Sequence, residues 1–205
     1  MVKRALESKP EFQNIYTAFH EKIRRYLARL VGEADSEDVT QEVFLKVNAG
    51  LDDFRGDSSL STWIYRIATN AAMDYRRKSL TGLQEQVADG RLTGDPTCEE
   101  DMAEDLSASP DRQLIRKEMN DCIKGIVDGL PENYRTVLIL SDLEELTNSE
   151  IAEVLDISLE TVKIRLHRSR ARLKKELAHH CSFYRDDRNE LACDRKAPSL
   201  KFLKK

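Results

Sequence analysis

The sequence predicts an all-α protein made of two small helical domains joined by a flexible acidic linker. Apolar residues recur at helical spacing in two blocks, residues 11–78 and 112–178, and neither block alternates as strands do, so no sheet is expected. Between them, residues 79–111 are rich in glycine, proline and acidic side chains and cannot bury much apolar surface. The chain therefore divides into residues 1–78, 79–111, 112–178 and a C-terminal extension, 179–205.

Composition narrows the classes of protein to consider. The 205 residues carry a net charge of −4, with 34% charged and 6% aromatic residues, which suits small helical domains with wetted surfaces. A polyanion binder that works by charge along its whole length is excluded. With no apolar run near the roughly 20 residues of a membrane span, no apolar secretion-signal core, and few cysteines, we expect a cytoplasmic protein without membrane insertion.

The first block predicts a helix with one apolar and one polar side. Val39, Val43 and Val47 recur every four residues with Phe44 beside them, and Asp35 or Ser36 can cap the helix. The other side is acidic and polar: Asp38, Gln41, Glu42 and Leu45.

A second helix is expected over residues 61–77, with Ile64, Ile67, Ala68 and Ala71 buried and Arg66, Asn70, Met73 and Arg77 on another face. Aromatic residues (Trp63, Tyr65, Tyr75) interleave here with Arg66, Asn70, Arg76 and Arg77. Aromatic rings beside basic and amide groups are the chemistry that grips unstacked single-stranded bases. The alternative is that Trp63 and Tyr75 are core residues, and taken alone the residues favour that interpretation.

The second block begins with an apolar stripe that Gly129 and Pro131 end: Leu114, Ile115, Met119, Ile123 and Ile126. Leu138, Leu140 and Leu143 are expected to continue its core.

Residues 150–173 change charge halfway, from an acidic first half to a basic second half. Thr147 and Glu150 form a T-x-x-E capping box that starts a helix, Asp156 lies where a tight turn needs a left-handed residue, and Ser158 can cap the next helix. The expected buried residues are Ile151, Ala152, Leu155, Val162, Leu166 and Leu173. This pattern predicts a helix–turn–helix whose second helix enters a DNA major groove. A solvated helical hairpin is the alternative, but the caps, the turn and the one-sided charge together favour DNA binding.

The C-terminal extension gathers His179, His180, Cys181 and Cys193. Eleven residues separate the two cysteines, which is not a standard zinc spacing. A solvated tail is one interpretation. The alternative interpretation is a regulatory segment that binds a metal or forms a reversible disulfide. Apart from such a metal, no cofactor is expected.

Two stretches in series resemble the extracytoplasmic-function (ECF) sigma factors of bacterial RNA polymerase. "SEDVTQEVFLKVNAGLDDFRGDSSLSTWIYRIATNAAMDYRRK" is similar to the family's region 2, and "LPENYRTVLILSDLEELTNSEIAEVLDISLETVKIRLHRSRARLKKEL" to its region 4. The departures are Asp156, where the family usually has glycine, and the C-terminal extension. The resemblance implies a protein without covalent chemistry that binds core polymerase, recognises −35 and −10 promoter elements and promotes melting.

The resemblance also implies roles for matching positions. Asp38, Gln41, Glu42 and Phe44 lie in the motif that docks on the clamp coiled coil of the largest polymerase subunit, with a core position as the alternative for Phe44. Asn70 matches the residue that helps to hold a flipped base of the −10 element, and Arg55 and Gly56 belong to the neighbouring DNA-facing loop. The remaining −10 candidates are Trp63, Arg66, Arg76 and Arg77, and the −35 candidates are Glu160, Thr161, Lys163, Arg165 and Arg168. The linker is expected near the template or RNA path, and an anti-sigma factor is a further expected partner.

Two other classes of protein fit the sequence less well. A regulator with a C-terminal helix–turn–helix would need a ligand pocket or an α/β phospho-acceptor domain, and residues 11–78 show neither pattern. An enzyme would need a catalytic motif, and there is no P-loop, dinucleotide-binding glycine pattern or H-E-x-x-H. His20 is expected to be a surface or boundary residue.

Overall fold

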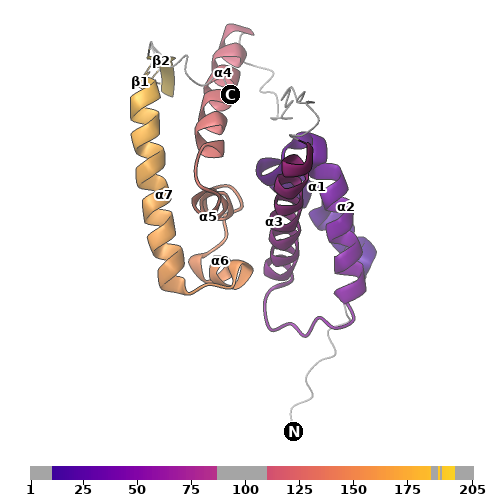
Figure 1. The fold of residues 1–205 in the computed structure, drawn as a ribbon. Helices are drawn as coiled ribbons and strands as arrows, with labels where there is room; N and C mark the ends of the chain where they lie inside the picture. Colours follow the sequence, from indigo (N-terminus) through magenta and orange to yellow (C-terminus); the bar gives the residue numbers. More distant parts are fainter. Residues whose placement is uncertain (1–10, 87–109, 186–188, 190, 197–205) are drawn as a thin grey trace. The chain divides into compact units, whose positions relative to one another are not determined.

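The computed structural model describes residues 11–86, 110–185, 189 and 191–196, which form seven helices and two short strands. The chain divides into two compact units. The first contains helices α1 to α3 together with α6, and the second contains α4, α5, α7 and the strands. Figure 1 labels each of these elements.

The first unit is built on three helices: α1 (Phe12–Val31), α2 (Glu33–Gly50) and α3 (Leu60–Gln86). The predicted stripe of α2 is confirmed, since Val39, Val43, Val47 and Phe44 are all buried. A buried hydrogen bond joins α1 to α3, with the Tyr26 hydroxyl 2.7 Å from the Thr69 hydroxyl. Aliphatic and aromatic side chains together supply this core, and the buried polar contact between Tyr26 and Thr69 is satisfied within it.

The ends of two predicted helices were wrong. Neither Asp35 nor Ser36 caps α2, because the helix already begins at Glu33 and the Ser36 hydroxyl donates to the Glu33 carbonyl. Gly32, at φ 97°, sets this earlier start by ending α1. The third helix does not stop near residue 77 but continues to Gln86, since no proline interrupts that stretch.

The second unit packs α5 (Glu132–Asp142) against α7 (Leu159–His180), with α4 (Pro110–Asp128) beside α7. As predicted, α4 ends just before Gly129, and Leu138, Leu140, Val162 and Leu166 are buried. Leu143 was wrongly assigned to the core, because α5 ends before it and its side chain is 53% exposed.

Helix α6 (Asn148–Leu155) begins and ends as the sequence predicts. The capping box is complete: the Thr147 N–H donates to the Glu150 carboxylate at 2.8 Å, and the Glu150 N–H donates to the Thr147 hydroxyl at 3.3 Å. Asp156 ends the helix in the left-handed conformation, at φ 51° and ψ 49°.

Replacing Asp156 by glycine should stabilise the protein, because glycine adopts this backbone conformation without a Cβ penalty. We expect a gain of about 0.5–1 kcal/mol in the free energy of unfolding, measured by urea denaturation. Asp156→Ala is the matched control and should destabilise, since it keeps the Cβ and removes the short polar side chain. A less stable glycine variant would contradict this account.

The expectation of no sheet was wrong at the C-terminal extension. Strands β1 (Cys181–Arg185) and β2 (Leu191–Arg195) pair antiparallel, with Phe183 opposite Cys193. Lys196 fastens this hairpin to α7: its N–H donates to the His180 carbonyl at 2.9 Å and its Nζ to the Ala178 carbonyl at 2.7 Å. These five-residue strands contain no β-branched side chain, and they are too short for an alternation pattern to reveal them.

Candidate nucleic-acid and protein interfaces

The first candidate surface is the outer face of α3, formed by Trp63, Arg66, Asn70, Met73 and Arg77. Arg66, Asn70 and Arg77 are exposed, and Trp63 and Met73 are half-buried. Trp63 packs on Phe54, with ring centroids 5.1 Å apart, and a Cβ on Gly50 would lie only 3.1 Å from its ring. Trp63 is thus both supported by its neighbours and partly open, which reconciles the two interpretations left by the sequence.

The other predicted −10 residues are placed differently from one another. Arg55 is exposed, in the loop where Gly56 adopts φ 76°. Arg76 is half-buried, and its Nη1 donates to the Leu30 carbonyl at 3.4 Å. Arg76 therefore connects α3 to the end of α1, a structural role that the sequence did not reveal.

The second candidate surface is the outer face of α2, which we define as Asp38, Gln41, Glu42 and Leu45. Asp38 and Gln41 are exposed, Glu42 is half-buried, and Leu45 is 71% exposed. Glu42 lies 2.6 Å from the Lys46 ammonium, and this hydrogen bond lowers the pKa of Glu42. The face is acidic around one uncovered leucine, a combination suited to a basic protein surface with an apolar depression.

Phe44, predicted beside these residues, is only 3% exposed. Its ring packs against Tyr16 and His20, with centroids 4.9 and 5.8 Å away. It belongs to the core and supports the outer face of α2 from beneath, so it does not offer a contact surface itself. His20 is half-buried here, as the sequence analysis expected of a boundary residue.

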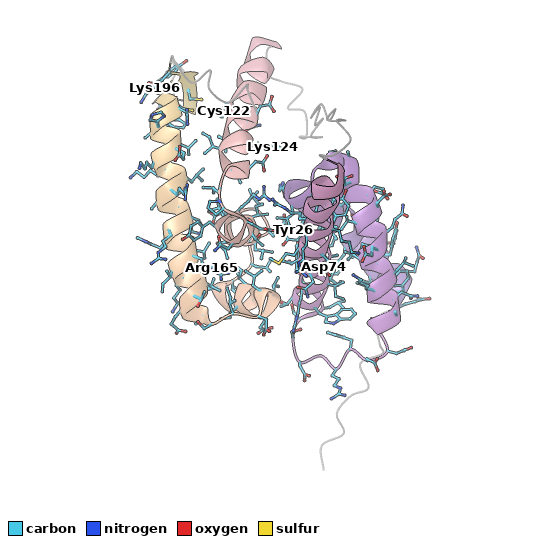
Figure 2. All side chains as sticks on the ribbon, viewed as in Figure 1. Tyr26, Asp74, Cys122, Lys124, Arg165 and Lys196 are labelled. Atoms are coloured by element: carbon cyan, nitrogen blue, oxygen red, sulfur yellow. The ribbon has the colours of Figure 1, made fainter. Side chains whose placement is uncertain are left out.

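The third candidate surface is the outer face of α7. Glu160, Lys163 and Arg168 are exposed, and Thr161 and Arg165 are half-buried (Figure 2 labels Arg165). The structure adds Ile164, which is 51% exposed and which sequence reasoning missed. Its position four residues after Glu160 and four before Arg168 was the available signal, because these spacings share one face of a helix.

Arg170 is charged but differs from the residues of that outer face. Its Nε donates to the Asp142 carboxylate at 3.3 Å and its Nη2 to the Ser141 hydroxyl at 3.1 Å. These contacts brace α7 against α5. The hydrogen bond from Arg170 lowers the pKa of Asp142, outweighing burial, which acts in the opposite direction.

Stability should depend on pH through Asp142. Because the hydrogen bond from Arg170 holds the folded pKa of Asp142 below its unfolded value, the stabilisation is fully present above the unfolded pKa and is lost as pH falls through the folded pKa. Both partners are largely exposed, so we expect less than about 1 kcal/mol. Urea denaturation of wild type and Asp142→Asn should differ at pH 7 and converge once the pH falls below the folded pKa of Asp142. A constant difference across this range would contradict the assignment.

The fourth site is a group of thiols in the second unit. The Sγ atoms of Cys122, on α4, and Cys181, at the start of β1, lie 3.6 Å apart. Cys181 is 2% exposed, whereas Cys122 and Cys193 are half-buried. Burial, followed by the neighbouring thiols Cys122 and Cys193, raises the pKa of Cys181 to about 12.

These positions change the sequence-based hypothesis for the extension. Cys122, which the sequence analysis did not consider, supplies the thiol beside Cys181. His180 is buried with its Nε2 3.6 Å from the Glu176 carboxylate, and His179 is exposed with its ring against that of His180. In the part of the chain that the structure describes, no group of three or more His, Cys, Asp or Glu side chains is arranged to hold a metal ion. The metal hypothesis for His179, His180, Cys181 and Cys193 thus stays a prediction.

Across residues 11–86 and 110–180, the helices include none long and apolar enough to cross a membrane. Along the chain, a capped α6, a left-handed turn at Asp156 and an α7 with one buried and one basic side follow one another as in a helix–turn–helix, the motif of a class of DNA-binding proteins. The same chain carries α1 to α3, with the aromatic and basic outer face of α3.

Comparison with known proteins gives the family. Residues 15–80 match the model of sigma-70 region 2, and residues 120–173 match that of sigma-70, region 4. The chain belongs to the ECF sigma factors of the sigma-70 family, whose members act with RNA polymerase in promoter-specific transcription initiation.

The curated relatives cover most of the chain. It is 33% identical over 182 residues to ECF RNA polymerase sigma factor SigW of Bacillus subtilis, covering 81% of this chain and 88% of that protein. It is 30% identical over 167 residues to the ECF RNA polymerase sigma-E factor of Escherichia coli K12, covering 78% and 82%.

Two solved structures have similar folds. One is the sigma factor RpoE in complex with the anti-sigma factor NepR from Bartonella quintana, with a TM-score of 0.64 and 20% identity, covering 82% of this chain and 96% of that chain. The other is CnrH in complex with the cytosolic domain of CnrY, with a TM-score of 0.58 and 22% identity, covering 82% and 88%.

Proposed function

We propose that this sigma factor reads the −35 element with α7, captures an extruded base of the −10 element with α3, and docks on the clamp coiled coil of the largest polymerase subunit with α2. The observation that carries the proposal is the two-sided character of α7. Val162 and Leu166 are buried, while Lys163 and Arg168 on its other side are exposed.

The −35 assignment follows from the chemistry of the outer face of α7. Arginine side chains pair bidentately with guanine edges, lysine neutralises phosphates, and a carboxylate such as Glu160 accepts from cytosine. Ile164 adds an apolar side chain that suits a thymine methyl group. A face with all these groups can read mixed sequence, whereas a purely basic one would bind DNA without discrimination.

The −10 assignment rests on the outer face of α3. Asn70 presents an exposed amide one helical turn from exposed Arg66, and the partly open Trp63 ring lies one turn before Arg66. An amide hydrogen-bonds a base edge, an aromatic ring stacks on an extruded base, and the arginines hold the backbone. Stacking contributes about 1–3 kcal/mol per base, comparable with the few kcal/mol that unstacking a step costs.

Docking on polymerase rests on the acidic outer face of α2, centred on Leu45. Arg76 and Phe44 have supporting roles in this proposal: Arg76 links α3 to α1, and Phe44 fills the core beneath α2. No covalent chemistry and no cofactor are needed for these steps.

An anti-sigma factor is a proposed further partner. Both similar solved structures hold the sigma factor bound to another protein: the anti-sigma factor NepR in one and the cytosolic domain of CnrY in the other.

The proposed function is tested by run-off transcription with core polymerase and a promoter library. We expect transcripts only from promoters that share a −35 and a −10 sequence, spaced at a fixed distance. Transcription without a shared −35 element would remove the role of α7, and failure to stimulate core enzyme on any promoter would remove the whole proposal.

Asn70→Ala should separate melting from binding. Without the amide, we expect core association to be unchanged and permanganate reactivity of −10 thymines to fall about tenfold, since a lost hydrogen bond to a base costs about 1–3 kcal/mol. Asn14→Ala, an exposed asparagine on α1, is the matched control and should melt the promoter normally. Normal melting by Asn70→Ala would show that Asn70 is not the base-holding residue.

A further inference from the structure

We propose that Cys122 and Cys181 are the site of a reversible disulfide, formed when the protein meets a peroxide, which ties α4 to the C-terminal end of α7. The two thiols are free, and their Sγ atoms are 3.6 Å apart although 59 positions separate them in the chain. A disulfide needs about 2.05 Å, so an approach of roughly 1.5 Å joins them. Side-chain rotation can supply much of that movement.

The thiols are held together by the fold and not by proximity in sequence. Cys181 opens β1 directly after α7, and Lys196 fixes the other strand of the hairpin to the last carbonyls of α7. Cys122 lies on α4, which packs against both α7 and β2 (Figure 2 labels Cys122 and Lys196). A partner for Cys181 is therefore built into the folded second unit.

The two sulfurs differ in access, which sets the order of the chemistry. Cys122 is half-buried and Cys181 is almost fully buried, with its thiol kept protonated by burial and by the neighbouring thiols. A peroxide reaches Cys122 first: the thiol sulfur takes one peroxide oxygen, giving the sulfenic acid and one water. Cys181 then attacks the Cys122 sulfur, the S–O bond breaks, and the leaving hydroxide takes the Cys181 proton as a second water. In sum, two thiols and one peroxide give a disulfide and two waters.

Cys193 is the competing thiol. It pairs with Phe183 across the hairpin and also interacts with the Cys181 thiol, but its effect on the pKa of Cys181 is smaller than that of Cys122, whose Sγ atom lies 3.6 Å from that of Cys181. The sequence suggested a disulfide between Cys181 and Cys193, which would only join the two strands of the hairpin. A bond from Cys122 instead closes a loop that contains α5, α6 and α7, so oxidation would constrain the whole helix–turn–helix.

The test uses the full chain, reduced and then treated with one equivalent of hydrogen peroxide. We expect the free thiols to fall from four to two, a Cys122–Cys181 linked peptide in a non-reducing digest, and a rise of about 10 °C in melting temperature that dithiothreitol reverses. Cys122→Ser should abolish the linked peptide and the rise. Cys193→Ser, the matched control at the other half-buried thiol, should keep both.

Cys122→Ala, checked for unchanged helix content by circular dichroism, guards against a serine variant that fails to fold. A linked peptide joining Cys181 to Cys193, an unchanged thiol count, or a stoichiometric zinc ion that protects the thiols would each overturn the proposal.

Discussion

Replacing Asp38 and Glu42 together by arginine is expected to abolish association with core RNA polymerase while the protein remains folded. The two carboxylates lie one turn apart on the outer face of α2, and neither is buried, so the reversal changes the surface without disturbing the core. Like charges placed across an interface cost several kcal/mol. We expect the dissociation constant to rise about 100-fold or more, measured by fluorescence anisotropy with labelled protein.

The matched control changes the same number of charges beyond the end of that helix. Asp52 and Asp53 are exposed in the loop after α2, and Asp52→Arg with Asp53→Arg gives the same net charge change. This control should bind core polymerase nearly as tightly as wild type. Equal loss of binding in both double variants would indicate a general charge effect, and full binding by Asp38→Arg with Glu42→Arg would remove α2 as the docking surface.

Local patterns predicted much of this fold, because helices are specified by spacing and caps within a few residues. The capping box of Thr147 and Glu150, the left-handed Asp156 and the stripe of Val39, Val43 and Val47 all depend on neighbours in sequence, and all three are present. The ends of the helices were harder to predict from the sequence. The start of α2 depends on the backbone of Gly32, which ends one helix and begins the next.

What the sequence could not show depends on contacts between distant segments. Arg76 resembled a DNA-binding residue, but 46 positions away the Leu30 carbonyl accepts its hydrogen bond. Cys122 had no local feature that suggested a partner for Cys181. In each case the sequence identifies the chemical group. Its role depends on packing between distant segments, which the spacing of apolar residues does not encode.

Arg168→Ala is expected to weaken promoter binding by the polymerase complex by about 1–3 kcal/mol, or roughly 5- to 150-fold, if the guanidinium reads a base edge. Its side chain is exposed on the outer face of α7, so truncation should leave folding unchanged. The loss should be confined to promoters that carry the base read by Arg168. Promoters with another base at that position should bind the variant as tightly as they bind wild type. Arg165→Ala, half-buried on the same face, should show a similar or smaller loss.

Salt dependence separates base reading from phosphate contact for these two arginines. A phosphate contact would weaken all promoters equally and reduce the slope of log affinity against log salt by about one. Arg170→Ala is the matched control, since Arg170 lies on the same helix but is held by Asp142 and Ser141. It should alter stability by less than about 1 kcal/mol and leave promoter discrimination intact. If Arg168→Ala and Arg165→Ala bind every promoter as wild type does, while Arg170→Ala weakens binding, the DNA-facing side of α7 is a different one from that assigned here.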